Sequence, residues 1–202
     1  MRRGISGPAG ALLATLLAVG LAASSLASGG SLTGTVKCVG VKNSADAVVY
    51  VDSIPGKVFP PPKDHVQIDQ KGMVFIPHVL PVLVGTTVDF LNSDPFLHNV
   101  FTPDKCAEKF NLGSWPQGHV RSYTFKKPCV ATLLCNVHPE MEAFAVAVST
   151  PYFAVTDPQG AYVIKDVPDG AYTVRVWHPK LKEAVQPVTV AGETVVNFEI
   201  KK

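Results

Sequence analysis

Hydrophobic and polar residues alternate along most of this chain with the short period of β-strands. Residues 65–69 and 120–125 alternate in this way, and no window has a sustained helical period. Turn residues recur at intervals of roughly 8 to 12 residues, which is typical of an antiparallel sandwich or barrel. The pattern therefore predicts an all-β fold, with at most a short helix within residues 103–109.

The expected strands fall into three groups. Between the first and second groups, Pro60, Pro61 and Pro62 interrupt the pattern. Because proline lacks a backbone N–H and has a fixed φ, this run cannot continue a sheet, and we predict a linker or domain boundary there. The expected strands are residues 31–41 and 47–51; then 65–69, 73–77, 79–84, 87–92, 110–112, 120–125, 130–135 and 143–148; and finally 152–156, 161–164, 172–177, 185–190 and 194–200.

The first 27 residues lack the alternating pattern of the rest of the chain. It carries Arg2 and Arg3, then an apolar run over residues 11–23, then small residues up to Ala27, which is the pattern of a cleaved signal peptide over residues 1–27. The apolar run is shorter than the roughly 20 residues that a membrane-spanning helix needs. We therefore predict cleavage near Ala27, a periplasmic or secreted mature protein and no stable membrane insertion.

The charge of the mature chain excludes two classes of partner. Removing the two signal arginines leaves 16 basic side chains against 16 acidic ones, so the mature chain is formally neutral. Proteins that bind nucleic acid or an anionic membrane surface concentrate positive charge. Neither is therefore an expected partner.

Four side chains with metal-ligand chemistry lie in two short segments. Cys135, His138 and Met141 have the spacing Cys-x2-His-x2-Met after an expected strand, and His98 follows the end of another. Two imidazoles, one thiolate and a weaker axial thioether are the ligand set of a blue (type 1) copper site. The neighbouring Asn99 is expected to support the loop by hydrogen bonds.

Each of these residues has a simpler interpretation when taken alone. A buried Cys is commonly a packing residue, a His before Pro commonly lies in a turn, and a Met beside a strand is commonly part of the core. Their combination at the end of a strand in an exported β protein favours metal binding. Zinc is the competing ion, but it prefers nitrogen, thiolate and carboxylate ligands over a thioether, so copper is expected.

The remaining three cysteines are interpreted in the light of export, because an oxidising compartment permits disulfides. Cys106 and Cys129 flank a segment with hairpin character, and a disulfide between them is favoured over two free thiols. Cys38 would then be a single thiol, most simply a small buried apolar side chain.

The copper segments resemble those of the plastocyanin-like cupredoxins. The similarity rests on residues 92–94 (Asn-Ser-Asp), residues 98–100 (His-Asn-Val) and the Cys-x2-His-x2-Met loop, whose short spacing is similar to that of amicyanin. It covers about residues 65–150 and implies an eight-stranded Greek-key sandwich with one mononuclear copper. The ligands that the resemblance implies are His98, Cys135, His138 and Met141.

A second resemblance concerns the C-terminal part of the chain. Residues 156–176, with their Asp-Pro-Gln-Gly and Pro-Asp-Gly turns, look like the transthyretin-type β-sandwich of carboxypeptidase regulatory-like modules. Such a module usually begins with strands like those expected at residues 34–36 and 47–51.

This resemblance leads to a hypothesis about the domains. Residues 151–202 alone are few for a sandwich core, because a small domain buries too little surface. We predict that residues 31–62 and 151–202 form one discontinuous, smaller sandwich, into which a cupredoxin domain of residues 63–150 is inserted. In the alternative, residues 31–62 extend the cupredoxin sheet.

The ligand set and the cupredoxin resemblance together indicate an exported one-electron carrier that alternates between Cu(I) and Cu(II), and the second module is expected to serve as a scaffold or docking element. His138 would be the electron exit, and Pro95, Phe96, Leu97 and Pro139 would form an apolar surface around it. Such a surface suits brief contact with a redox protein such as a cytochrome or dehydrogenase.

Two other functions are less consistent with the sequence. Copper storage or delivery is the alternative, but an exchanging site favours several thioethers, and only Met73 and Met141 follow the signal. Multicopper oxidases and copper nitrite reductases also resemble this fold, but they need additional histidines, typically His-x-His pairs, which this sequence lacks. Catalysis by this chain alone is therefore not expected, and the other histidines, at 65, 78, 119 and 178, are expected to be structural or surface residues.

Overall fold

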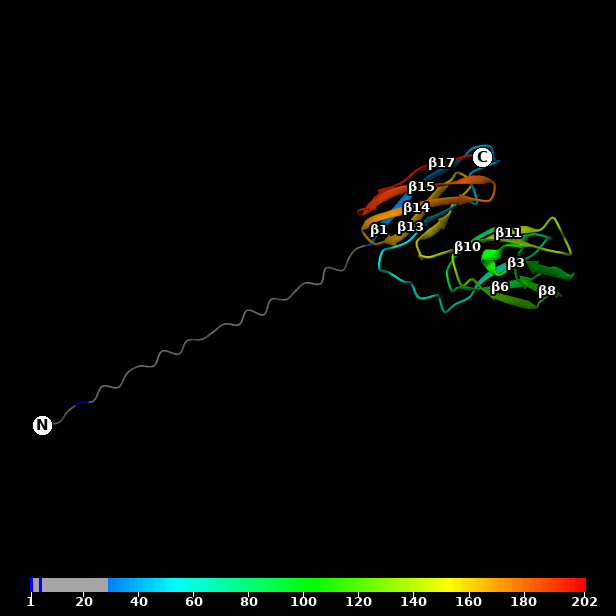
Figure 1. Ribbon diagram of the computed structural model, residues 1–202, viewed down its shortest axis with the longest axis horizontal. Helices are drawn as coiled ribbons and strands as arrows, with labels where there is room; N and C mark the ends of the chain where they lie inside the picture. Colours follow the sequence, from blue (N-terminus) through cyan, green and yellow to red (C-terminus); the bar gives the residue numbers. More distant parts are fainter. Residues whose placement is uncertain (2–3, 5–28) are drawn as a thin grey trace.

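The computed structural model describes Met1, Gly4 and residues 29–202, and nearly all of its regular structure is β-strand (Figure 1). Apart from Met1 and Gly4, the predicted signal peptide lies outside the described residues, as does its cleavage point near Ala27. Within the described part, no helix has the length and hydrophobicity needed to cross a membrane. The all-β prediction is confirmed.

Apart from a long segment, residues 52–65, that joins the second strand to the third, the elements mostly follow one another with short connections. In chain order they are β1 (Gly30–Cys38), β2 (Val48–Val51), β3 (Val66–Gln70), β4 (Phe75–Ile76), β5 (Val79–Leu83), β6 (Thr87–Asn92), β7 (His98–Phe101), the 3-10 helix η1 (Lys105–Ala107), β8 (Asn111–Trp115), β9 (Val120–Thr124), β10 (Cys129–Leu134), β11 (Glu142–Val148), β12 (Phe153–Val155), β13 (Ala161–Val167), β14 (Gly170–His178), β15 (Leu181–Val190), β16 (Glu193–Val195) and β17 (Phe198–Ile200).

The middle of the chain forms one sandwich of two sheets, which we call the first sandwich. One sheet has the strand order β5-β11-β10-β7-β8, and the other has the order β4-β3-β6-β9. Ile68 and Phe90 from the second sheet pack in one buried core with Leu133 from the first. Inward-facing residues alternate along β6 and β10, as the period-2 pattern requires. The sandwich has one strand more than the eight implied by the resemblance, because the two-residue β4 pairs with β3.

Strands from the two ends of the described chain form a second sandwich (Figure 1). In Figure 1, β1 (blue) lies among β13, β14, β15 and β17 (yellow to red), beside the green first sandwich. One sheet has the order β13-β1-β16 with β17 also paired to β1, and the other has the order β12-β2-β14-β15. Val49 of β2 is in register with Val176 of β14, so residues 47–51 pair with the C-terminal part of the chain. The domain boundaries and the carboxypeptidase-type resemblance of this part stay predictions.

The two sandwiches pack against each other through strands that are buried on both faces. Along β11 the alanines face the core of the first sandwich, whereas the larger side chains form an interface cluster with Val48 of β2. In this cluster the rings of Phe144 and Trp177 lie 5.4 Å apart. The residues of β11 that face the cluster are Phe144, Val146 and Val148, and those that face the core are Ala143, Ala145 and Ala147. A strand covered on both faces is uninterruptedly apolar, as β11 is after Glu142.

Several strands differ from the predicted ones. The sequence pattern predicts no strand at β7, because the polar His98 and Asn99 are buried beside Val100 and hide the alternation. The strand expected over residues 194–200 is two strands, β16 and β17, which both pair with β1. β15 begins at Leu181, earlier than expected, because an edge strand can expose polar residues such as Lys182. The short helix expected within residues 103–109 is present as η1.

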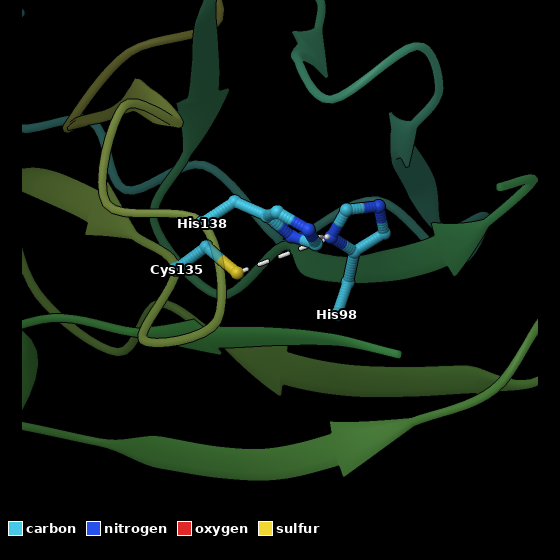
Figure 2. Close-up of side chains that lie close together, drawn as sticks. All are labelled: His98, Cys135 and His138. Atoms are coloured by element: carbon cyan, nitrogen blue, oxygen red, sulfur yellow. Dashed lines mark hydrogen bonds between the residues drawn. The ribbon is translucent and has the colours of Figure 1, made fainter. Parts of the chain in front are cut away.

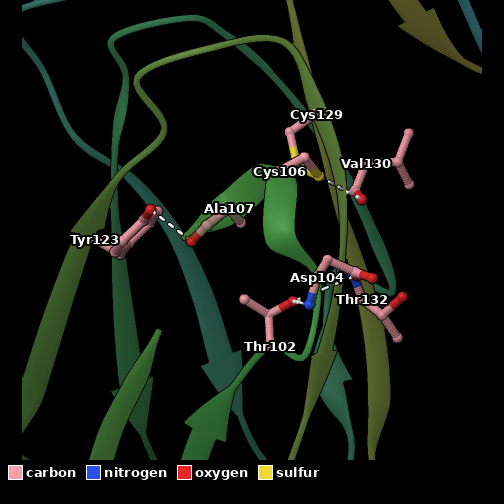
Figure 3. The surroundings of a disulfide bond; sticks show 8 residues. All are labelled: Thr102, Asp104, Cys106, Ala107, Tyr123, Cys129, Val130 and Thr132. Carbon is pink, nitrogen blue, oxygen red and sulfur yellow. Dashed lines mark hydrogen bonds between the residues drawn. A yellow bond between two sulfur atoms is a disulfide. The ribbon is translucent and has the colours of Figure 1, made fainter. Parts of the chain in front are cut away.

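The predicted disulfide between Cys106 and Cys129 is present, with a Cα–Cα distance of 5.5 Å, and it ties η1 to the start of β10 (Figure 3). Asp104 strengthens the same connection, because its Oδ2 accepts a hydrogen bond of 2.7 Å from the backbone N–H of Thr132. Cys38 is a free and buried thiol, as expected, and Cys135 is buried and takes part in no disulfide. The strand that leads into the Cys135 loop is thus anchored at its beginning.

The disulfide is expected to contribute substantially to stability. Its cysteines are 23 residues apart, and a cross-link over a loop of that length stabilises a domain by about 2–4 kcal/mol, chiefly by restricting the unfolded chain. The double variant Cys106→Ala/Cys129→Ala should therefore lower the free energy of unfolding by that amount in urea denaturation. Wild-type protein kept in a reductant should match the variant. A difference below about 0.5 kcal/mol would contradict the structure.

Candidate metal centre

The loop that carries three of the predicted ligands closes the hairpin of β10 and β11. These strands pair antiparallel up to Leu134 and Glu142, so the chain from Cys135 to Met141 must turn back within a short span. The backbone N–H of Met141 donates a 3.0 Å hydrogen bond to the carbonyl of His138, which forms the turn. His98 begins β7, which pairs with β10 next to the loop. The structure therefore brings His98 to the loop from a distant part of the sequence.

The ligand atoms of His98, Cys135 and His138 all lie within 4.8 Å of one another (Figure 2). The Nδ1 atoms of the two histidines are 3.1 Å apart, and Cys135 Sγ is 3.9 Å from His98 Nδ1. Nitrogen and sulfur ligands bound at about 2.0 and 2.3 Å to one ion are themselves separated by ~3–4 Å. The three side chains therefore fit a single metal ion. Among the described residues, no other group of His, Cys and acidic side chains is this compact.

Burial distinguishes the four predicted ligands. The exposed fractions of His98, Cys135 and Met141 are 0%, 3% and 1%, whereas His138 is partly exposed. Met141 and Cys135 belong to the same buried core cluster, which places the thioether residue on the interior side of the loop. A donor set of thiolate, imidazole and thioether is soft and suits copper. The four candidate ligands are therefore buried except for His138, which reaches the surface.

Asn99 supports the loop, as predicted. Its backbone N–H points at Cys135 Sγ at 3.4 Å, and its Oδ1 accepts a hydrogen bond of 3.3 Å from the N–H of Asn136. Its Nδ2 donates to Asn111 Oδ1 and to the carbonyl of Gly113 in β8. The Asn99 side chain therefore connects β8 to the ligand loop.

Asn92 holds the other ligand segment. This side chain is only 2% exposed, and its Nδ2 donates to the carbonyls of Phe96 and Trp115 at 2.8 and 2.9 Å. Its Oδ1 accepts the N–H of Asp94 at 3.0 Å. The segment that precedes His98 is thereby fixed to β8.

Asp94, which lies in the Asn-Ser-Asp motif of residues 92–94, contacts the candidate ligand His98. Its Oδ2 lies 2.9 Å from His98 Nε2, and both side chains are buried. Burial by itself would raise the pKa of Asp94, but hydrogen bonds from the backbone amides of Met73 and Gly72 and from His98 outweigh it and lower the pKa. The only sign of this contact in the sequence is the four-residue separation of Asp94 and His98. In a loop, unlike in a helix, that separation does not predict that two side chains touch.

An apolar surface surrounds the exposed edge of His138. The ring of Phe96 lies 5.8 Å from that of His98 and 5.7 Å from that of His138. Phe96, Leu97 and Val137 are 44%, 50% and 44% exposed. Val137, which lies inside the ligand loop, was not among the surface residues expected from the sequence.

Comparison with known proteins gives no match to a protein-family model and no significant match to a curated protein. Among solved structures, it is similar to a copper-containing nitrite reductase from Thermus scotoductus SA-01, at 26% identity over 50% of this chain and 25% of that chain (TM-score 0.41). It is also similar to a novel purple cupredoxin from Nitrosopumilus maritimus, at 24% identity over 41% of this chain and 98% of that chain (TM-score 0.37).

A reduced mutant of amicyanin matches at 22% identity over 50% of this chain and 98% of that chain (TM-score 0.40). This chain spans only a quarter of the length of the nitrite reductase that it matches. At TM-scores this low, the similarities assign no function to this chain.

The hydrogen bonds of Asn99 should contribute measurably to stability. Asn99→Ala leaves the N–H of Asn136 and the carbonyl of Gly113 without their partner, which should lower the free energy of unfolding by about 1–3 kcal/mol. Asn43→Ala is a matched control, because Asn43 is exposed in a turn of the second sandwich, and it should change stability by less than about 0.5 kcal/mol. Equal effects in chemical denaturation would show that the Asn99 contacts do not hold the loop.

Proposed function

We propose that this chain is an exported carrier of single electrons that holds one copper ion with His98, Cys135, His138 and Met141. The observation that carries the proposal is the convergence of a thiolate and two imidazole nitrogens within 4.8 Å, beside a buried thioether residue. A bound copper ion would supply the Cu(I)/Cu(II) couple. The chain would act as a carrier between redox partners rather than as a catalyst.

Electron transfer requires ligands that stay in place when the oxidation state changes. Here Cys135 Sγ faces the backbone N–H of Asn99, and the ring of His98 is held at Nε2 by Asp94. Asn92 and Asn99 tie both ligand segments to β8. Because these contacts are made by the backbone and side chains of the protein itself, the chain favours one ligand geometry for both oxidation states.

The surface around His138 supports its role as the electron exit. It is the one predicted ligand that is not buried, the exposed Phe96 lies against its ring, and the exposed Val137 precedes it in the loop. An apolar surface of this kind can exclude water during a short contact with a redox protein such as a cytochrome or dehydrogenase. Copper delivery would require ready exchange of the metal, so the burial of the other three ligands supports a carrier over a delivery protein.

The first test is the visible spectrum of the purified protein after addition of Cu(II). Wild type should develop an intense blue or green band, because the Cys135 thiolate donates charge to Cu(II). Cys135→Ser should lose the band, and Cys38→Ser should keep it because Cys38 lies in the core of the second sandwich. A colourless copper complex of the wild type would overturn the proposal.

The second test concerns the surface around His138. Phe96→Asp should slow electron self-exchange between two copies of the copper-loaded protein by about tenfold or more, because each copy would bring a charge to an apolar contact. Val163→Asp is the matched control, since Val163 is 53% exposed on the second sandwich. Self-exchange rates from NMR line widths give the comparison. If both variants exchange like the wild type, electrons leave by another surface.

A further inference from the structure

Both ring nitrogens of His98 have a defined partner in the interior of the protein. Nδ1 faces the Nδ1 of His138 at 3.1 Å and the sulfur of Cys135 at 3.9 Å. Nε2 faces Oδ2 of Asp94 at 2.9 Å, and the two side chains are 0% and 8% exposed. A carboxylate only accepts hydrogen bonds, so Nε2 carries the proton and the lone pair of Nδ1 points toward Cys135 and His138.

The carboxylate of Asp94 is itself fixed. The backbone N–H of Gly72 donates to Oδ1 at 2.7 Å, and the backbone N–H of Met73 donates to Oδ2 at 2.9 Å. Gly72 and Met73 have φ values of 68° and 58°, so this turn between β3 and β4 adopts a left-handed conformation that directs successive amides at one side chain. Asp94 therefore connects this turn to His98.

We propose that Asp94 is a positioning residue that orients His98 and makes the site favour Cu(II) over Cu(I). This inference rests on the proposed function, because it requires copper at His98. A carboxylate behind a metal-bound histidine orients the ring and makes its nitrogen a stronger donor. Reduction adds one electron and lowers the net charge of the site by one, and a buried negative charge nearby opposes that change. His138 is the more exposed of the two histidines, and its nearest aromatic neighbour besides His98 is Phe96.

The test is the reduction potential of the copper-loaded variant Asp94→Asn. Asparagine keeps the size of the side chain but removes its charge. The ratio of Cu(II) to Cu(I) affinity should fall about tenfold, which is a rise of ~59 mV for a one-electron couple. The Cu(II) affinity itself should fall by about 10- to 100-fold. Both quantities are measurable, by spectroelectrochemistry and by competition with a Cu(II) chelator.

Asp69→Asn is the matched control, because it removes the same charge from a neighbouring side chain that accepts a hydrogen bond from Ser93 instead of His98. The reduction potential of copper-loaded Asp69→Asn should stay close to that of the wild type. If Asp94→Asn shifts the potential no more than Asp69→Asn does, the inference is wrong. The thiolate band of the wild type separates this result from a failure of the proposed function, in which the band itself is absent.

Asp94→Glu is the second variant, which decides the question if Asp94→Asn does not fold by circular dichroism. Glutamate keeps the charge but moves the carboxylate by one methylene group. The potential should stay nearer to that of the wild type than in Asp94→Asn, while the Cu(II) electron paramagnetic resonance spectrum changes with the orientation of His98. A spectrum and a copper affinity identical to those of the wild type would overturn the positioning role.

Discussion

Six residue pairs join β10 to β11, from Cys129 opposite Ala147 to Leu134 opposite Glu142, and this register leaves one short loop between the strands. Because the strands are held on both sides of that loop, its side chains have little freedom. The disulfide at Cys129 anchors the hairpin at the end away from the loop. The candidate metal centre therefore depends on a pairing of backbone atoms that involves none of the ligand side chains.

Packing on both faces of β11 reinforces that constraint. Alanines fill the core side, where the sheets of the first sandwich approach each other, and Phe144 and its larger neighbours fill the side that meets the second sandwich. A shift of the strand by one residue would exchange these two faces and place large side chains where only alanine fits. The second sandwich thus helps to hold the strand that follows Met141, although it contributes no ligand.

Buried polar side chains concentrate around the centre. Asn92, Asp94 and Asn99 are all buried, and each is hydrogen-bonded to a backbone group. A buried polar group destabilises a protein unless it is hydrogen-bonded, so these three residues specify one arrangement of the loops. An apolar core of the same shape would hold the strands, but the ligand loops could then adopt several conformations, because apolar contacts are not directional.

The sequence alone determined the all-β class, most strands, the disulfide and the set of candidate ligands, because alternation, turn residues and the Cys-x2-His-x2-Met spacing are local patterns. It did not reveal β7, whose buried His98 and Asn99 break the alternation, or the contact between Asp94 and His98. The pairing of β2 with β14 was only one of two alternatives, and Val137 was missed as a surface residue. These features depend on contacts between residues far apart in the chain or on the path of a loop, which only the tertiary structure decides.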